Sequence, residues 1–240
     1  MTVREILQII RERLPDEWAM RVSDLRLLHA LNQAYRRFAY DAYAIEETVE
    51  FNVPSGVGRW VLPDWVGVVR AAVWRTPDGA RYALQPISRY WVETLDPNWQ
   101  ENFGKGIPTS YFVYSSKEIV LVPCPEQGGC LEARCVLLPS KDPLAPVREL
   151  QSPDDQPVIP ELFHEVLIDG ALAQMFLSPV DPNHLQLHAF YEQRFEQGVK
   201  KFKSYVDTLD DRSLEVRSFL IPTPIVFDVK LPMSHGGGAL

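Results

Sequence analysis

The chain has 240 residues, of which 46% are hydrophobic and 23% are charged, a composition that is typical of globular proteins and excludes extensive disorder. Its formal net charge of −8 excludes a broad basic surface for holding nucleic acid. Three cysteines are too few for a disulfide scaffold, and no apolar run approaches the roughly 18–20 residues of a membrane span. No signal peptide is visible at the N-terminus, so we expect a soluble protein made in a reducing cytoplasm and no membrane partner.

Prolines divide the chain into stretches of different secondary structure. Fourteen of the 20 prolines lie between Pro54 and Pro160, whereas residues 16–53 and 183–221 contain none. Because proline breaks helix interiors and punctuates short strands, this distribution predicts helices, then a β-rich insertion, then helices. The expected fold is therefore α+β: a four-helix bundle interrupted by a small antiparallel β-sandwich or barrel insertion, with an extended C-terminal arm. The expected boundaries are 1–44 for the first half of the bundle, 45–156 for the β-rich insertion, 157–211 for the second half of the bundle and 212–240 for the arm.

Two helices are expected before residue 45. Thr2 and Glu5 form a capping box at the start of the first helix, which Pro15 ends, and Ser23 caps the second. Apolar residues recur at helical spacing in both segments, which predicts one buried face on each. These faces comprise Val3, Ile6, Leu7, Ile10 and Leu14 in the first helix, and Leu25, Leu28, Leu31, Tyr35, Phe38 and Ala42 in the second.

From about residue 46 the apolar period changes to two, which is typical of half-buried strands. Strands are expected at 48–53, 59–62, 66–75 and 131–137, and a hairpin at 111–122. In the last strand Leu131, Ala133, Cys135 and Leu137 are expected to share one face, with Glu132 and Arg134 on the other. Six or so strands of this length favour a small sandwich or barrel.

Two further helices are expected after the strands. Pro160 suits the first turn of one helix, and Gly170 within it could allow another helix to approach closely. The next helix begins at Asp181-Pro182, and its aspartates up to Asp211 are expected to mark a solvated end. The predicted buried residues are Leu162, Phe163, Val166, Leu167 and Ala171 in the first of these helices, and His188, Phe195, Val199, Phe202 and Val206 in the second.

A metal site is one candidate for chemistry. His184 and His188 lie four residues apart on a helix, and His164 with Glu165 or Asp169 could complete a site. The pair lacks the intervening glutamate of a zincin, and nothing in the sequence fixes a third ligand. Packing roles for these histidines are favoured, and no metal or cofactor is expected.

The cysteines and glycines do not form a catalytic or metal-binding motif. Cys124, Cys130 and Cys135 are not in a C-x-x-C pattern, and a fourth ligand for a structural zinc is missing, so core packing is favoured. Cys124 and Cys130 could oppose each other across a hairpin, although a disulfide is not expected in a cytoplasmic protein. There is no G-x-S-x-G elbow, Walker loop or G-x-G-x-x-G motif, and Gly104-Lys105-Gly106 precedes a proline rather than a helix. The sequence therefore predicts no enzyme.

Two clusters permit a binding interpretation. Lys200, Lys201 and Lys203 form one basic cluster, which we interpret as a solvated helix end complementing the helix dipole rather than a phosphate site. The β-rich region is rich in tryptophan, which would suit ligand stacking if the rings shared one face, although core or rim positions are more typical of a small sandwich. These tryptophans are Trp60, Trp65, Trp74, Trp91 and Trp99.

The C-terminal arm carries the candidate interface. Apolar residues alternate with Asp228 and Lys230, and prolines bracket the segment, as in a half-buried strand. Such a strand is prone to aggregate unless it pairs with something. It could close the protein's own sheet, but we favour strand addition to a neighbouring subunit or partner. The residues predicted for this interface are Phe219, Ile221, Ile225, Phe227, Val229 and Leu231.

Short segments spread along the chain resemble the head-to-tail adaptor proteins of tailed bacteriophages, also called connector or neck proteins. These segments are residues 32–38, 60–66, 106–112, 119–125 and 157–164, and the similarity covers about Arg21 to Asp207. The resemblance implies a helical bundle interrupted by a β-domain, a dodecameric ring between the portal protein and the tail or nozzle proteins, a channel for DNA passage without specific binding, and no enzymatic activity. It also implies a virion protein that assembles in the host cytoplasm.

Two other functions are compatible with the residues. A ligand- or glycan-binding module could use the tryptophan-rich sheet, and a metallohydrolase could be built around His164, His184 and His188. Neither is supported by a specific motif.

Overall fold

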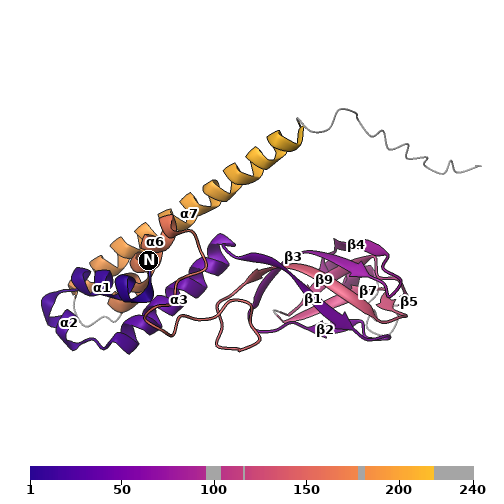
Figure 1. The fold of residues 1–240 in the computed structure, drawn as a ribbon. Coiled ribbons are helices and arrows are strands. Elements are labelled where there is room, and N and C mark those ends of the chain that lie inside the picture. The colour runs from indigo at the N-terminus through magenta and orange to yellow at the C-terminus, as the bar shows by residue number, and fades with distance from the viewer. Residues whose placement is uncertain (96–103, 116, 178–181, 219–240) are drawn as a thin grey trace, which may run out of the picture. The chain divides into compact units, whose positions relative to one another are not determined.

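The chain has a mixed α+β fold in the computed structural model, which describes residues 1–95, 104–115, 117–177 and 182–218 (Figure 1). Met1–Lys203 form one compact unit, and Ser204–Leu240 form a second, of which the described part is helical. In the described residues the helices are α1 (Val3–Arg13), α2 (Asp16–Arg21), α3 (Asp24–Ala42), α4 (Arg89–Leu95), α6 (His164–Phe176) and α7 (Pro182–Ser218), with a 3₁₀ turn, η1, at Glu161–Phe163. The mixed class agrees with the sequence, whereas a four-helix bundle is not shown.

The N-terminal helices begin and end at the predicted signals. Thr2 and Glu5 form the capping box of α1, and the Ser23 side chain accepts a hydrogen bond from the Arg26 backbone at the start of α3. Tyr43, in the left-handed conformation with φ of 51°, ends α3. The short helix α2, which the sequence does not predict, forms directly after Pro15 because proline can precede a first helical turn without losing a needed donor.

The buried face of α3 differs from the predicted one. Leu31 and Phe38 are buried as expected, but Leu25 is 77% exposed. The side chain that replaces it in the core is Leu27, which lies about 200° around the helix from Leu25 at 100° per residue. Leu25 therefore lies outside the core, at the mouth of a groove described below.

The strands form one curled sheet of seven strands rather than a fully antiparallel sandwich. Their order is β1-β9-β3-β4-β6-β7-β2, and β4 and β6 pair in parallel, whereas the other neighbours are antiparallel. A parallel pair needs a crossover connection, and the segment containing α4 supplies it between β4 and β6. The strands are β1 (Glu46–Val53), β2 (Arg59–Val61), β3 (Val66–Arg75), β4 (Arg81–Pro86), β6 (Ser110–Tyr114), β7 (Glu118–Val122) and β9 (Gly129–Leu137), and a separate parallel pair is formed by β5 (Lys105–Gly106) and β8 (Cys124–Pro125).

The curl of the sheet follows from its connections. β1 and β2 lie at opposite edges of the sheet, yet only residues 54–58 join them. This turn uses Gly56 at a φ of 74°, and the Gly58 carbonyl accepts a hydrogen bond of 2.8 Å from the Leu121 amide of β7. The two edges of the sheet are therefore brought toward each other, as in a barrel that closes incompletely.

The strand β9 buries a carboxylate, that of Glu132, on the face that the sequence predicts to be opposite Leu131. Glu132 is buried, and its carboxylate forms ion pairs with two arginines. Arg75 of β3 places its Nε 3.0 Å from a carboxylate oxygen, and Arg81 of β4 is the second partner. At Glu132 the polar face of β9 is covered by arginines from β3, its neighbour in the sheet, and from β4, the next strand along. Arg134, which is predicted to share that face, is exposed.

The helix α6 is buried on nearly every side. Its residues from Val166 to Phe176 contact α3 and α7, and Gly170 confirms the predicted close helix approach. A Cβ atom at Gly170 would lie 2.7 Å from the Phe195 ring and 2.9 Å from the Ala34 Cβ. A helix that is buried on nearly all sides is typical of the centre of a core.

The helix α7 continues past its predicted end. It has 37 residues and runs to Ser218, seven residues beyond Asp211. Aspartate costs only a fraction of a kcal/mol in a helix interior, roughly 0.7 kcal/mol or less relative to alanine, so the acidic run does not stop the helix.

Candidate functional site

The residues predicted as metal ligands have separate structural roles. The His164 ring lies 3.1 Å from the Ile159 carbonyl, and burial lowers the pKa of His164, which favours a neutral ring. His184 packs edge-on against Trp18, with ring centroids 4.6 Å apart. His188 Nδ1 lies 2.9 Å from the Ala173 carbonyl. Across the described residues, no group of three or more histidine, cysteine, aspartate or glutamate side chains could hold a metal ion.

The two acidic candidates of that metal hypothesis belong to an ion network between helices. Asp169 of α6, whose side chain is 6% exposed, pairs with Arg194 of α7 at 3.0 Å and with Arg13 of α1 at 3.5 Å. Arg13 also pairs with Glu165. Burial raises the pKa of Asp169, against the opposing effect of Arg194. The network thus links three helices and gives α6 a fixed position between α1 and α7.

A second ion pair, between Arg37 and Glu192, links α3 to α7. Arg37 donates two hydrogen bonds to the Glu192 carboxylate, one of them 2.9 Å long, and its guanidinium lies 4.7 Å from the centre of the Phe195 ring. The hydrogen bonds from Arg37 lower the pKa of Glu192. A bidentate pair of this kind fixes both the distance and the rotation of the two helices.

We expect Glu192→Gln to lower the free energy of unfolding by about 1 kcal/mol at pH 7, since the pair is partly exposed. The folded pKa of Glu192 is lowered, so its contribution is present above the ordinary glutamate pKa and is lost as the pH falls through the folded pKa. Urea unfolding should therefore separate the variant from the parent at pH 7, and the difference should shrink as the pH falls through the folded pKa of Glu192. Glu196→Gln, one turn further along α7 and exposed, is the matched control.

The cysteines are free thiols, as expected from core packing. Cys130 and Cys135 are buried in β9, and Cys124 in β8 is half-buried. Burial raises the pKa of the Cys135 thiol to about 12, so it is not a nucleophile at neutral pH.

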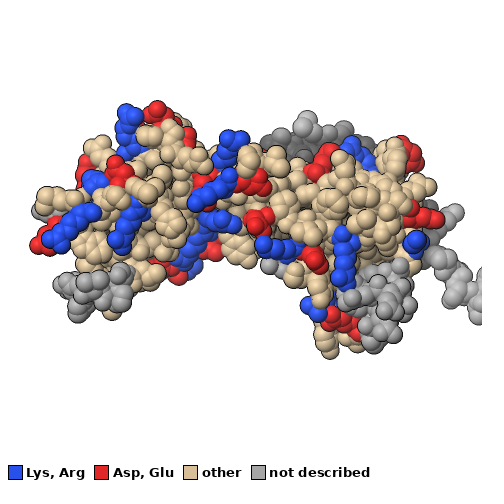
Figure 2. Space-filling view, turned by 90° about the horizontal axis from the view of Figure 1, so that it is seen from below, with Lys and Arg blue, Asp and Glu red and all other residues tan. Residues whose placement is uncertain are grey.

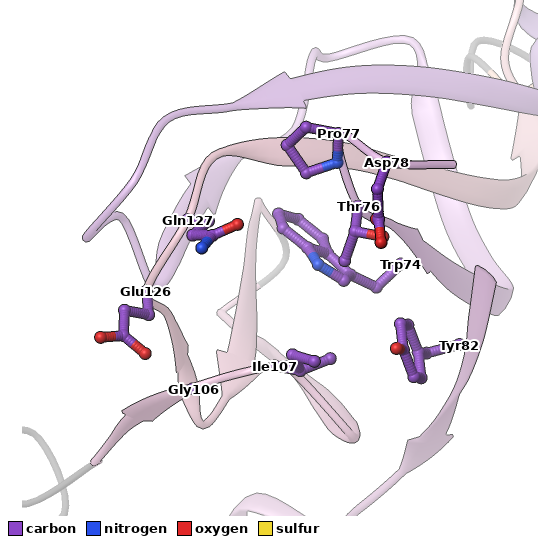
Figure 3. Close-up of a pocket in the computed structure, with 9 residues that line it drawn as sticks. All are labelled: Trp74, Thr76, Pro77, Asp78, Tyr82, Gly106, Ile107, Glu126 and Gln127. Carbon is purple, nitrogen blue, oxygen red and sulfur yellow. The ribbon is translucent and has the colours of Figure 1, made fainter. Parts of the chain in front are cut away.

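The tryptophans do not share one face of the sheet. Trp65 and Trp74 are buried, and Trp91 is exposed on α4, while Trp99 lies outside the described residues. A pocket of about 420 Å³ lies beside Trp74 and Tyr82, which are cross-strand partners on β3 and β4 (Figure 3). Trp74 is only 1% exposed, because its ring covers Gly129, so it offers no face for a sugar to stack on. This geometry does not favour the glycan-binding alternative.

Charged residues do not form a phosphate-binding surface on the face shown in Figure 2. There, basic and acidic side chains of the described residues are interspersed. Of the predicted basic cluster, Lys203 lies 5.3 Å from the centre of the Tyr43 ring, and Lys200 and Lys201 are exposed. The cluster is exposed as predicted, but the predicted helix end is wrong, because these lysines lie within α7, which continues to Ser218.

The helix α7 carries its apolar stripe beyond the compact unit. Phe195, Val199 and Phe202 are buried, and the same spacing of four and three residues continues at Val206 and Leu209. Leu209 lies in the second unit and is exposed. An apolar stripe that continues on an exposed helix is typical of a surface that meets another chain.

Comparison with known proteins decides the family. The family described as SU10 adaptor protein matches residues 1–217, which is most of the chain and includes every strand in its described part. The chain belongs to this family. No curated protein matches it.

A phage adaptor is a component of a virion and interacts with other virion proteins. Membership in a family of structural proteins is consistent with the expectation that the adaptor is not an enzyme. Among the described helices, none combines the length and the apolar character that a bilayer span requires. As a phage adaptor, the protein needs surfaces that contact other virion proteins.

The match ends before the predicted interface of the adaptor. Residues 219–240 lie beyond the matched range and outside the described residues, and so do all six predicted interface side chains. Sequence reasoning missed the exposed leucine at position 25, because its spacing from Leu28 is that of a buried stripe. The signal available was that α3 has more apolar positions than one buried face requires.

Proposed function

We propose that this adaptor forms a dodecameric ring between the portal protein and the tail or nozzle proteins of a tailed phage, and that DNA passes through the ring. The observation that carries the proposal is the family match over residues 1–217. Assembly takes place in the host cytoplasm, and the protein has no enzymatic activity in this proposal.

A ring requires each copy to present two different surfaces, because a head-to-tail contact closes by rotation. The exposed apolar stripe of α7 near Leu209 supplies one such surface. The arm supplies another in this proposal, through strand addition to a neighbouring chain. Its contact residues are Phe219, Ile221, Ile225, Phe227, Val229 and Leu231.

DNA passage requires a surface that does not hold phosphates. The net charge of −8 and the pairing of arginines with carboxylates support this part of the proposal. Arg37, Arg75 and Arg194, for example, are each within 3.0 Å of a carboxylate oxygen, so they are less available to neutralise phosphates. An acidic lumen would let DNA slide without specific binding.

The experiment mixes the full-length adaptor with the portal protein of the same phage and images the particles by negative-stain electron microscopy. We expect dodecameric rings seated on the portal. The adaptor alone and the portal alone are the controls, and they also show whether the ring forms before docking. Adaptor that neither binds the portal nor forms rings with it would contradict the proposed function.

A further inference from the structure

An apolar groove lies between α1 and the first turn of α3. Its volume is about 530 Å³, which is in the range of pockets that bind small ligands and peptide side chains. One wall is α1, and the other is formed by α3 and the segment around Pro153. The groove is lined by Val3, Arg4, Leu7, Gln8, Arg11, Asp24, Leu25, Leu28, Gln151 and Pro153.

The leucines of this groove are apolar positions that the fold itself does not bury. Leu7 and Leu28 are half-buried, and Leu25 is 77% exposed, although all three belong to the apolar stripes of their helices. The stripes of α1 and α3 are thus wider than the core that they form with α6. The three leucines that the core does not bury line the same groove. They therefore form a contiguous apolar patch, whereas isolated exposed apolar residues are ordinary on a protein surface.

The charged groups at the rim are already paired with one another. Arg11 donates to the Ala19 and Val22 carbonyls and pairs with Asp24. Arg4 pairs with Asp154, just outside the groove. Because these charges satisfy each other, the groove selects an apolar face rather than an ionic ligand.

The Phe227–Leu231 segment, outside the described residues, offers such a face. Phe227, Val229 and Leu231 alternate with polar residues, so in an extended strand they share one face. Phe227 and Leu231 would then lie about 13 Å apart. Along α1, the groove extends from Val3 to Arg11, a helical rise of about 12 Å. The spacing of Phe227 and Leu231 in an extended strand therefore matches the length of the groove along α1.

The length of the chain after α7 permits such a contact between copies. The helix ends at Ser218, and the nine residues from there to Phe227 can span about 30 Å when extended. We infer that the groove between α1 and α3 of one copy binds the Phe227–Leu231 segment of a second copy. The inference rests on the proposed function, since a segment and a groove on different surfaces generate the head-to-tail contact that a ring requires.

Cross-linking between two tagged full-length chains tests the inference. Both chains carry Cys124→Ser, because Cys124 is the least buried of the three cysteines. One chain also carries Leu25→Cys, and the other, with a tag of different size, carries Val229→Cys. A short bis-maleimide reagent should join the two tagged chains at high protein concentration. The matched control is Met20→Cys in place of Leu25→Cys, since Met20 is 82% exposed but does not line the groove.

The outcomes are distinct. A product joining both tags with Leu25→Cys, and its loss with Met20→Cys, supports the inference. No joined product at the highest soluble concentration, or an equal product with Met20→Cys, overturns it.

A second variant separates this inference from the proposed function. Leu25→Asp places a charge at the mouth of the groove, and we expect it to abolish ring formation on the portal, whereas Met20→Asp should not. If removal of residues 219–240 abolishes assembly but Leu25→Asp does not, the proposed function stands and the groove is not the site. If removal of the arm leaves assembly intact, the role of the arm in the proposed function fails as well.

Discussion

Phe38→Ala is expected to lower the free energy of unfolding by about 3–5 kcal/mol, the usual cost of removing a buried aromatic ring. Phe38 is fully buried in α3, and its ring meets those of Phe195 and Phe202 edge-on, with centroids 6.4 Å and 5.2 Å apart. The substitution would leave a cavity between α3 and α7 that the surrounding backbone cannot close. Urea or guanidinium unfolding followed by circular dichroism measures the effect.

Leu25→Ala is the control for that measurement. Leu25 belongs to the same predicted stripe as Phe38 but is exposed, so its truncation should change the free energy of unfolding by no more than about 0.5 kcal/mol. A cost for Leu25→Ala similar to that of Phe38→Ala would show that the observed burial of α3 is wrong. Leu25→Ala also serves as a stability control for Leu25→Cys and Leu25→Asp, because it shows that Leu25 can be changed without unfolding the chain.

The sequence predicts those parts of the fold that depend on local signals. The capping box at Thr2, the Ser23 cap and the β6–β7 hairpin are confirmed, because each depends on residues close together in the chain. The long strand β3 has the bounds that its β-branched run predicts. Proline spacing separates the helical and β-rich stretches for the same reason, since its effect on the backbone is local.

Features that depend on distant contacts are not predicted. The parallel pairing of β4 with β6 is set by a crossover, and no pattern within either strand distinguishes it from an antiparallel pairing. The burial of Glu132 depends on arginines from two other strands, 57 and 51 residues away. Whether Leu25 or Leu27 is buried depends on which helices pack around α3. The periodicity of the α3 sequence does not contain that information.

The candidate sites illustrate the same limit. Histidines four residues apart satisfy the spacing for a metal, but in the fold His184 packs on an aromatic ring and His188 lies against a carbonyl of another helix. The resemblance to phage adaptors was informative where the single motifs were not, because it used several segments along the chain at once. The family match confirms it and extends over α1, which the resemblance did not cover.

Substitution of the apolar face of the arm is expected to abolish assembly without unfolding the chain. The variant carries Phe227→Ser, Val229→Ser and Leu231→Ser, which remove the side chains proposed to contact a neighbouring chain while keeping the length of the arm. These residues follow the last described helix and lie beyond the family match, so the unfolding transition of Met1–Lys203 should not change. Negative-stain images with the portal protein should show no rings for this variant and normal rings for the parent.

The opposite face of the same segment supplies the control for that experiment. Asp228→Ser with Lys230→Ser changes the residues between the three apolar ones and leaves the alternating apolar face intact. If backbone pairing and the apolar side chains hold the neighbouring chain, this variant should assemble, because strand addition draws its affinity from the main chain and its specificity from alternate side chains.

If both variants assemble as the parent does, the arm is not an interface, and the exposed stripe of α7 near Leu209 becomes the surface that must hold the ring together. If both fail, the segment acts through its charge as well as its apolar face, which the paired charges around the groove do not permit.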